Sequence, residues 1–243
     1  MFSIFRKNIY LVDLIDGITD FHNHVLPGID DGAKDIDESV SLINGFKEIG
    51  VKNIIATPHV IGEYYPNTPE TISKAYKLLV SEIESEILIG YSAEYMLDQH
   101  FLGILEKDEV ITIRDKKILV EMSYFQPPLN LNEILFKIQN HSFSPILAHP
   151  ERYAFYHSKD LAKYKDLKGR GCQFQLNMLS LSGHYGNGIQ KIAFKLLEGN
   201  FIDFICSDAH RIDHIDKIKN IKVPEKFQSA IESSVENNKQ LFI

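Results

Sequence analysis

Cysteine is scarce in this chain, which has two cysteines, Cys172 and Cys206, among 243 residues. They form no CxxC pair and are too few for a disulfide framework, which fits a reducing compartment. No run of 18 consecutive apolar residues occurs, so no membrane span is expected. The apolar start of residues 1–18 is interrupted by Asp13 and Asp16 and precedes no small-residue cleavage pattern. We therefore expect a soluble, cytoplasmic protein without a signal peptide.

Basic residues are also in the minority. The chain has 26 Lys and Arg against 33 Asp and Glu, a formal net charge of −7. A nucleic-acid-binding protein normally has a basic face, so this balance argues against nucleic acid as a partner. Carboxylates that hold metal ions add negative charge that the ions cancel. The negative net charge is therefore compatible with an anionic substrate.

Linkers rich in Gly and Ser, charge blocks and low-complexity tracts are absent, which predicts one domain over residues 1–243, with 1–18 as an N-terminal extension. Short apolar runs rich in β-branched residues recur along the chain and predict strands. They lie at about 18–22, 53–57, 87–92, 117–122, 145–149, 172–177 and 201–207.

Stretches with helical periodicity separate most of these strands. Asp35 with Glu38 predicts the start of a helix over 36–50, and Thr68 with Pro69 predicts the start of the next. Further helices are predicted near 130–141, 158–170, 187–199 and 224–238. Alternating strands and helices pair in parallel through right-handed crossovers. The predicted fold class is α/β, a distorted (β/α)7 TIM-like barrel, with a doubly wound open sheet as the alternative.

Histidine and carboxylate side chains stand at the ends of six of the seven predicted strands or in the loops that follow. They are His22, His24, Asp31, His59, Glu94, Glu121, His149, Asp208 and His210. The carboxyl ends of barrel strands converge, so these side chains are expected to meet there. Nitrogen and oxygen ligands without thiolates suit Zn²⁺, Mn²⁺ or Fe²⁺, and so many ligands predict a multinuclear site. The remaining histidines are predicted to be surface or packing residues: His100, His141, His157, His184 and His214.

In chain order, the motifs DFHNHVLPGIDDGAK, ATPH, SAE, VEMS, AHPER and CSDAH resemble the PHP (polymerase and histidinol phosphatase) family. They are especially similar to the bacterial manganese-dependent protein-tyrosine phosphatases of capsular and exopolysaccharide operons. The resemblance covers nearly the whole chain and implies a PHP-type barrel with a trinuclear manganese site, iron and zinc being the alternatives. The implied ligand sets are His22, His24, Glu94 and Asp208 for one ion, Glu94, Glu121 and His149 for a second, and Asp31, His59 and His210 for the third.

The resemblance also implies roles around the phosphate. Arg152 matches the family's phosphate-contacting arginine, and its planar fork suits a phosphate better than a lysine. A second arginine is absent from its matching place, and Arg211 is predicted to substitute for it in substrate binding. Arg152, Asp208 and His210 are the predicted catalytic residues, with His210 able to protonate the leaving group.

Aromatic residues in two loops predict how a substrate ring binds. Tyr64 follows the second predicted strand and Tyr124 follows the fourth, so both fall at the mouth of the barrel. An aromatic wall there favours phosphotyrosine over phosphoserine, whereas packing of loop against barrel is the alternative role. A cysteine nucleophile is excluded, because neither cysteine begins a C-x₅-R motif.

The predicted function is therefore that of a metal-dependent protein-tyrosine phosphatase, in which a metal-activated water hydrolyses phosphotyrosine. A bacterial tyrosine kinase in capsule or exopolysaccharide regulation is the partner that the resemblance implies. Alternatives are a small-molecule phosphatase such as histidinol-phosphate phosphatase, an amidohydrolase, and a domain that binds metal without catalysis. An amidohydrolase usually requires a bridging lysine where Glu94 stands. The sequence leaves homo-oligomerisation open.

Overall fold

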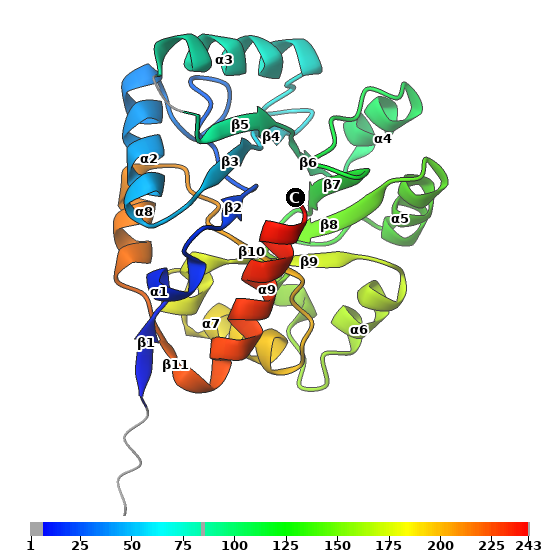
Figure 1. The fold of residues 1–243 in the computed structure, drawn as a ribbon. Helices are drawn as coiled ribbons and strands as arrows, with labels where there is room; N and C mark the ends of the chain where they lie inside the picture. Colours follow the sequence, from blue (N-terminus) through cyan, green and yellow to red (C-terminus); the bar gives the residue numbers. More distant parts are fainter. Residues whose placement is uncertain (1–6, 84–85, 243) are drawn as a thin grey trace, which may run out of the picture.

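The computed structural model describes residues 7–83 and 86–242. Its strands form a ring, and its helices lie around the outside (Figure 1). Seven strand positions make up the ring, two of them split into two short strands. In chain order they are β2 (Thr19–Asp20), β3 (Asn53–Ala56) with β4 (His59–Val60), β5 (Leu88–Tyr91) with β6 (Glu94–Met96), β7 (Lys117–Glu121), β8 (Ser144–Ala148), β9 (Gln173–Asn177) and β10 (Phe204–Cys206).

All pairs in the ring are parallel, in the orders β2-β3-β5 and β4-β6-β7-β8-β9-β10. Pro58 separates β3 from β4 because proline cannot donate a hydrogen bond to the ladder. The ring closes between β10 and β2. There Asp208 N donates to His22 O at 2.8 Å, and Asn23 forms an isolated parallel β-bridge with Ala209. The predicted seven-stranded barrel is confirmed, and the open sheet is excluded.

Six helices match the predicted ones: α2 (Ile36–Glu48), α3 (Pro69–Glu82), α5 (Leu131–Asn140), α6 (Ala162–Gly169), α7 (Asn187–Glu198) and α9 (Gln228–Gln240). The described residues also contain α1 (Val12–Ile15), α4 (Gln99–Glu106) and α8 (Ile212–Lys219), which the sequence analysis did not locate. The cap of α2 is one-sided, since Asp35 accepts from Glu38 N but the Glu38 carboxylate accepts from Lys34 N.

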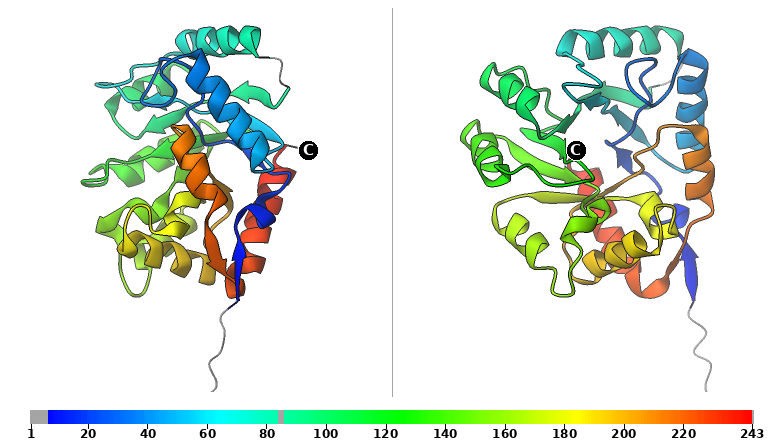
Figure 2. Two further views of the ribbon diagram at one scale, coloured as in Figure 1. Left: turned by 90° about the vertical axis from the view of Figure 1, so that its left-hand side faces the viewer. Right: turned by 180° about the vertical axis from the view of Figure 1, so that it is seen from behind.

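Helices α2 and α8 lie side by side on one flank of the barrel (Figure 2). Gly45 of α2 permits this close approach, because a Cβ there would lie 2.7 Å from Ile212 Cδ1 of α8. Residues 30–32 precede α2 and residues 208–210 precede α8. The contact between the helices therefore brings these two loops together.

The interior of the barrel holds an apolar cluster separate from the one under the helices. Leu119, Ile146 and Phe204 point inward, whereas their neighbours in the strands pack against the helices. Leu241, just after α9, belongs to the inner cluster, and the Phe242 ring lies 6.2 Å from the Phe21 ring. The end of α9 accordingly points to the centre of the ring (Figure 1).

The N-terminal segment is integrated into the same structure from residue 7 onward. Strand β1 (Asn8–Tyr10) pairs antiparallel with β11 (Lys222–Pro224), and Ile15 in α1 is fully buried. In the described part of the chain, no helix has the length and apolar character needed to cross a membrane.

Candidate metal centre

The nine side chains predicted as metal ligands meet at the carboxyl end of the barrel. Their nitrogen and carboxylate oxygen atoms form four overlapping groups within 4.8 Å. The groups are His22, His24 and Asp208; His22, Glu94 and His149; His59, Glu94 and Glu121; and His24, Asp31, His59 and His210.

Glu94, which begins β6 and is fully buried, lies at the middle of the cluster. Its Oε2 is 3.1 Å from His22 Nε2 and 3.0 Å from His59 Nδ1. Its Oε1 is 3.1 Å from His149 Nε2. One carboxylate thus contacts rings from three different strand ends, which is the arrangement of a bridging ligand.

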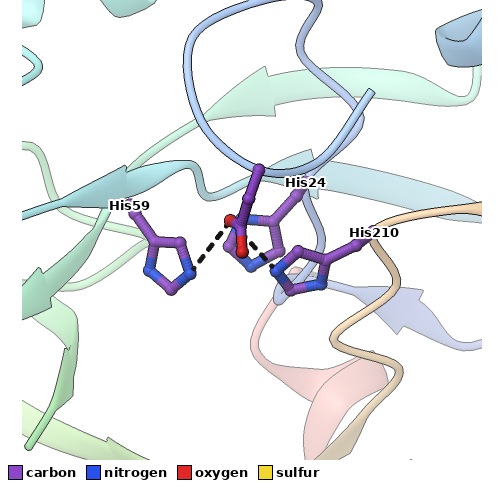
Figure 3. A group of neighbouring side chains, drawn as sticks. His24, His59 and His210 are labelled. Atoms are coloured by element: carbon purple, nitrogen blue, oxygen red, sulfur yellow. Dashed lines mark ion pairs between the residues drawn. The ribbon is translucent and has the colours of Figure 1, made fainter. Parts of the chain in front are cut away.

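Asp31 joins the outer part of the cluster from the loop before α2. Its Oδ1 lies 3.5 Å from both His59 Nε2 and His210 Nε2, the two dashed contacts in Figure 3. The His24 ring stacks on the His210 ring with their centroids 3.8 Å apart. The three rings and the carboxylate therefore face a common point.

Six buried atoms of this cluster have no hydrogen-bond partner: His22 Nε2, His24 Nε2, His59 Nδ1, His149 Nδ1, Glu94 Oε2 and Glu121 Oε1. Buried polar atoms in proteins are nearly always paired, so a concentration of unpaired ones needs a physical cause. Ring nitrogens and carboxylate oxygens that point at one another are the donor set of divalent transition metals. The residues fit a metal centre.

In three of the cluster's histidines, the other ring nitrogen already has a hydrogen-bond partner. His22 Nδ1 bonds to Gln175 Oε1 at 2.7 Å, and His24 Nδ1 bonds to Asp30 Oδ2 at 2.7 Å. His210 Nδ1 bonds to Asp208 O at 3.0 Å. Because these acceptors need a proton on Nδ1, each Nε2 carries its lone pair toward the cluster, as in known metal-bound histidines.

Strand β9, the one predicted strand without a ligand at its end, supplies amides that orient the ligands. Gln175 holds His22, and Asn177 Nδ2 donates to Asp208 Oδ2 at 2.9 Å. The sequence analysis missed both residues, although their i, i+2 spacing at a strand end was a visible signal. Asp30, the unassigned half of the Asp-Asp-Gly turn, was missed as well.

Gly32 completes that turn for a steric reason. A Cβ at this position would collide with the backbone oxygen and Cβ of His24. The turn can therefore pack directly against His24. His149 and Asp208 have positive φ angles of 35° and 52°, a strained backbone that proteins tolerate mainly at functional sites.

The buried carboxylates and histidines of the cluster shift one another's pKa values. Burial opposes ionisation of Glu94, but neighbouring His22 and His59 hold its pKa well below the ordinary value. Burial raises the pKa of Glu121, and the negative charge of Glu94 adds to that effect. The pKa values of the two carboxylates thus shift in opposite directions, and Glu94 is the one that the surrounding histidines keep ionised.

A pocket of about 500 Å³ opens directly onto the cluster. Arg152 lines it, with its guanidinium carbon 4.6 Å from the centroid of the Tyr124 ring and 4.2 Å from that of Tyr185. Arg152 also donates to Asp208 Oδ2 at 2.8 Å. Two rings and a carboxylate hold this cation in place. Tyr185 lies in the connection after β9 and was not among the predicted substrate-binding residues.

The other predicted substrate-binding residues are placed differently. Tyr64 and Tyr124 both line the pocket, and Tyr64 is 74% exposed. Arg211 is exposed and lines an adjoining cleft with Lys34, and its Nε donates to His214 Nε2 at 3.2 Å. The structure therefore does not bring Arg211 into the pocket beside Arg152.

Among the five histidines predicted to be surface or packing residues, one adjoins the cluster. His214 is buried in α8, and its Nδ1 accepts from His210 N at 3.4 Å. Neither cysteine is placed as a nucleophile. Cys206 is buried in the inner apolar cluster, where burial raises the pKa of its thiol, and burial raises the pKa of Cys172 to about 12.

Known proteins are similar to this chain in sequence and in fold. YwqE, a tyrosine-protein phosphatase of Bacillus subtilis strain 168, is 30% identical over 199 residues, which cover 79% of this chain and 77% of YwqE. CapC of Staphylococcus aureus is 29% identical over 232 residues, which cover 91% of this chain and 90% of CapC.

Solved structures agree with these sequence relationships. YwqE from Bacillus subtilis and CpsB from Streptococcus pneumoniae, described as unique metal-dependent tyrosine phosphatases, match with a TM-score of 0.78 at 26% identity, covering 92% of this chain and 94% of theirs. A phosphotriesterase homology protein of Escherichia coli shares the fold alone, with a TM-score of 0.53 at 12% identity. The sequence profile for capsular polysaccharide synthesis, CpsB/CapC, matches residues 18–226, so this chain belongs to the CpsB/CapC family.

Proposed function

We propose that this chain is a metal-dependent protein-tyrosine phosphatase. The observation that carries the proposal is the convergence of unpaired histidine nitrogens and carboxylate oxygens beneath a pocket that holds Arg152. A Lewis-acidic centre next to a fixed guanidinium is what phosphoryl transfer requires. The relatives YwqE and CpsB carry the name of tyrosine-protein phosphatase, which supports the same reaction class.

The proposed centre is trinuclear and holds manganese, with iron and zinc as alternatives. Asp208 with His22 and His24 would hold one ion, Glu121 with His149 a second, and Asp31 with His59 and His210 the third. Glu94 would bridge the first two. The close contacts of Glu94 with both His22 and His149 support that role. When bound, such ions lower the pKa of water towards neutrality and neutralise phosphoryl oxygens.

The chain's own side chains bind and orient the phosphate. Arg152, fixed between Tyr124 and Tyr185, would donate charge-assisted hydrogen bonds to the phosphoryl oxygens. Asn177 keeps Asp208 oriented while Arg152 bonds to the same carboxylate oxygen. His210, with its Nε2 toward the cluster, serves as a ligand in this proposal, and its role as a proton donor stays a prediction.

The proposed substrate is a phosphotyrosine protein, namely a bacterial tyrosine kinase that acts in capsule or exopolysaccharide regulation. The proposed location of the reaction is the cytoplasm. The aromatic lining of the pocket by Tyr64, Tyr65, Tyr124 and Phe125 supports an aryl phosphate. Histidinol phosphate, which has no benzene ring, would gain less from these walls.

A paired assay tests the proposal. Metal content is measured first, and the purified protein is then given a phosphotyrosine peptide, the matched phosphoserine peptide and histidinol phosphate. We expect the phosphotyrosine peptide to be hydrolysed fastest, and chelation to abolish the activity. Faster turnover of histidinol phosphate would contradict the tyrosine assignment, and turnover unaffected by metal removal would contradict the metal centre.

Removal of an aromatic wall should affect peptide binding more than chemistry. Tyr64→Ala is expected to raise KM for a phosphotyrosine peptide about tenfold, with little change for a small aryl phosphate, because the exposed ring reaches beyond the phosphate. Steady-state kinetics on both substrates measure the difference. Tyr10→Ala, which removes an exposed tyrosine of β1, is the control. Equal effects on the two substrates would show that Tyr64 does not contact the peptide.

Loss of the amide that orients His22 should weaken metal binding. Gln175→Leu removes the acceptor of His22 Nδ1–H and is expected to lower metal affinity about tenfold. Gln175→Glu keeps an acceptor at the same place and should retain most of the affinity. Metal titration of the apoprotein measures both variants. Unchanged affinity in Gln175→Leu would mean that His22 needs no such support.

A further inference from the structure

Large apolar side chains are exposed beside the candidate active site. In the described chain, Phe125 is 93% exposed and Leu129 is completely exposed, and both lie in the loop between β7 and α5. Tyr64 and Tyr124 are exposed at the same pocket. Apolar side chains gathered in water usually mark a binding surface. We call these four residues the apolar rim.

The apolar rim continues into a second pocket. Phe125 lines the candidate active-site pocket, while the next residues, 126–129, line a neighbouring pocket of about 310 Å³. Tyr156 lines the second pocket as well. The Tyr153 ring lies 5.9 Å from Tyr124 and 6.5 Å from Tyr156, so a row of rings connects the two pockets. The two pockets therefore adjoin along this loop, with Phe125 at the edge of the first.

The loop that separates the pockets is stiff. Pro127 and Pro128 fix two successive φ angles. Phe125 N donates to Ser123 Oγ at 3.3 Å, and Leu131 is buried where α5 begins. A loop held in this way loses little conformational entropy when a ligand binds to it. The exposed rings and Leu129 are therefore presented in advance of binding.

Resting on the proposed function, we propose that the protein substrate lies across Phe125 and seats an apolar side chain against Leu129 in the second pocket, a few residues from its phosphotyrosine. A small phosphate ester is accommodated by the first pocket alone and would not extend to Leu129. Lys163, at the wall of the second pocket, is paired with Asp166 at 2.9 Å. The positive charge at this pocket is already compensated, which disfavours a second phosphate, and Leu129, Leu131 and Tyr156 offer apolar contacts.

A peptide series tests the proposal with the metal-loaded protein. Each peptide has one phosphotyrosine in a Gly/Ser background and one leucine, moved through the positions on either side, and a leucine-free peptide and p-nitrophenyl phosphate are the references. We expect leucine at one or two positions to lower KM about tenfold. Leu129→Ser should remove this preference and leave p-nitrophenyl phosphate hydrolysis unchanged. Leu78→Ser, a matched change at an exposed leucine of α3, should retain the preference.

Several outcomes would overturn the proposal. One is the same KM for every peptide, and another is a leucine preference that survives Leu129→Ser. Vesicles containing phosphatidylglycerol and sedimentation velocity test other occupants of the rim. Lipid binding or self-association that requires Leu129, without a peptide preference, would make the rim a membrane or dimer contact. If no tyrosine peptide is hydrolysed at all, the proposed function itself fails, whereas equal hydrolysis of all peptides removes the docking proposal alone.

Discussion

Glu94→Gln is expected to abolish phosphatase turnover, with a loss on the order of a thousandfold or more, while the barrel stays folded. Glu94 is the residue whose two oxygens contact three histidine rings, His22, His59 and His149. An amide of the same shape cannot bridge two cations, because one of its two oxygens is replaced by a nitrogen that donates. The variant should also bind less metal.

Steady-state kinetics, metal analysis and circular dichroism measure this variant together. Glu109→Gln makes the same chemical change at an exposed glutamate and should behave as the wild type. A folded Glu94→Gln protein with full metal content and nearly normal turnover would show that Glu94 does not bridge ions. Loss of the folded barrel would place Glu94 among the groups that stabilise the fold.

The barrel could be predicted from the sequence because its strands are short apolar runs separated by helical periodicity. Helix α3 illustrates the clearest signal, since Thr68 caps it and Thr71 completes a reciprocal capping box. Helices α4 and α8 have eight residues each, about two turns, so their periodic signal is weak, although α6 of the same length was predicted. Leu241, which follows α9, packs inside a ring formed by residues far away in the sequence. No local sequence pattern indicates such a contact.

The convergence of the candidate ligands could be predicted because histidines and carboxylates stand at strand ends that meet. Their supports could not, since Gln175 and Asn177 resemble ordinary strand residues until the fold places them beside His22 and Asp208. Tyr185 shows the same limit, because nothing in its local sequence indicates that it stacks on Arg152. The sequence shows the chemical type of each side chain, whereas the contact that orients the side chain is a property of the tertiary structure.

Arg152→Lys is expected to lower kcat/KM for phosphotyrosine about tenfold to a hundredfold, although the charge is kept. The guanidinium lies between the rings of Tyr124 and Tyr185 and bonds to Asp208. A lysine has no planar fork to stack between two rings or to bond two phosphoryl oxygens at once. The effect should appear in kcat as well as in KM, because the fork is proposed to contact the phosphoryl group during transfer.

Two comparisons distinguish this role from a structural one. Arg170→Lys, at a surface arginine that pairs with Asp166, should leave kcat/KM unchanged. Tyr185→Leu should lower activity when Arg152 is present but add little to Arg152→Lys, since the ring acts by holding the guanidinium. Unchanged kcat/KM in Arg152→Lys would place Arg152 outside the phosphate site. Arg211, which lines the adjoining cleft beside His210, would then be the next candidate for contact with the phosphate.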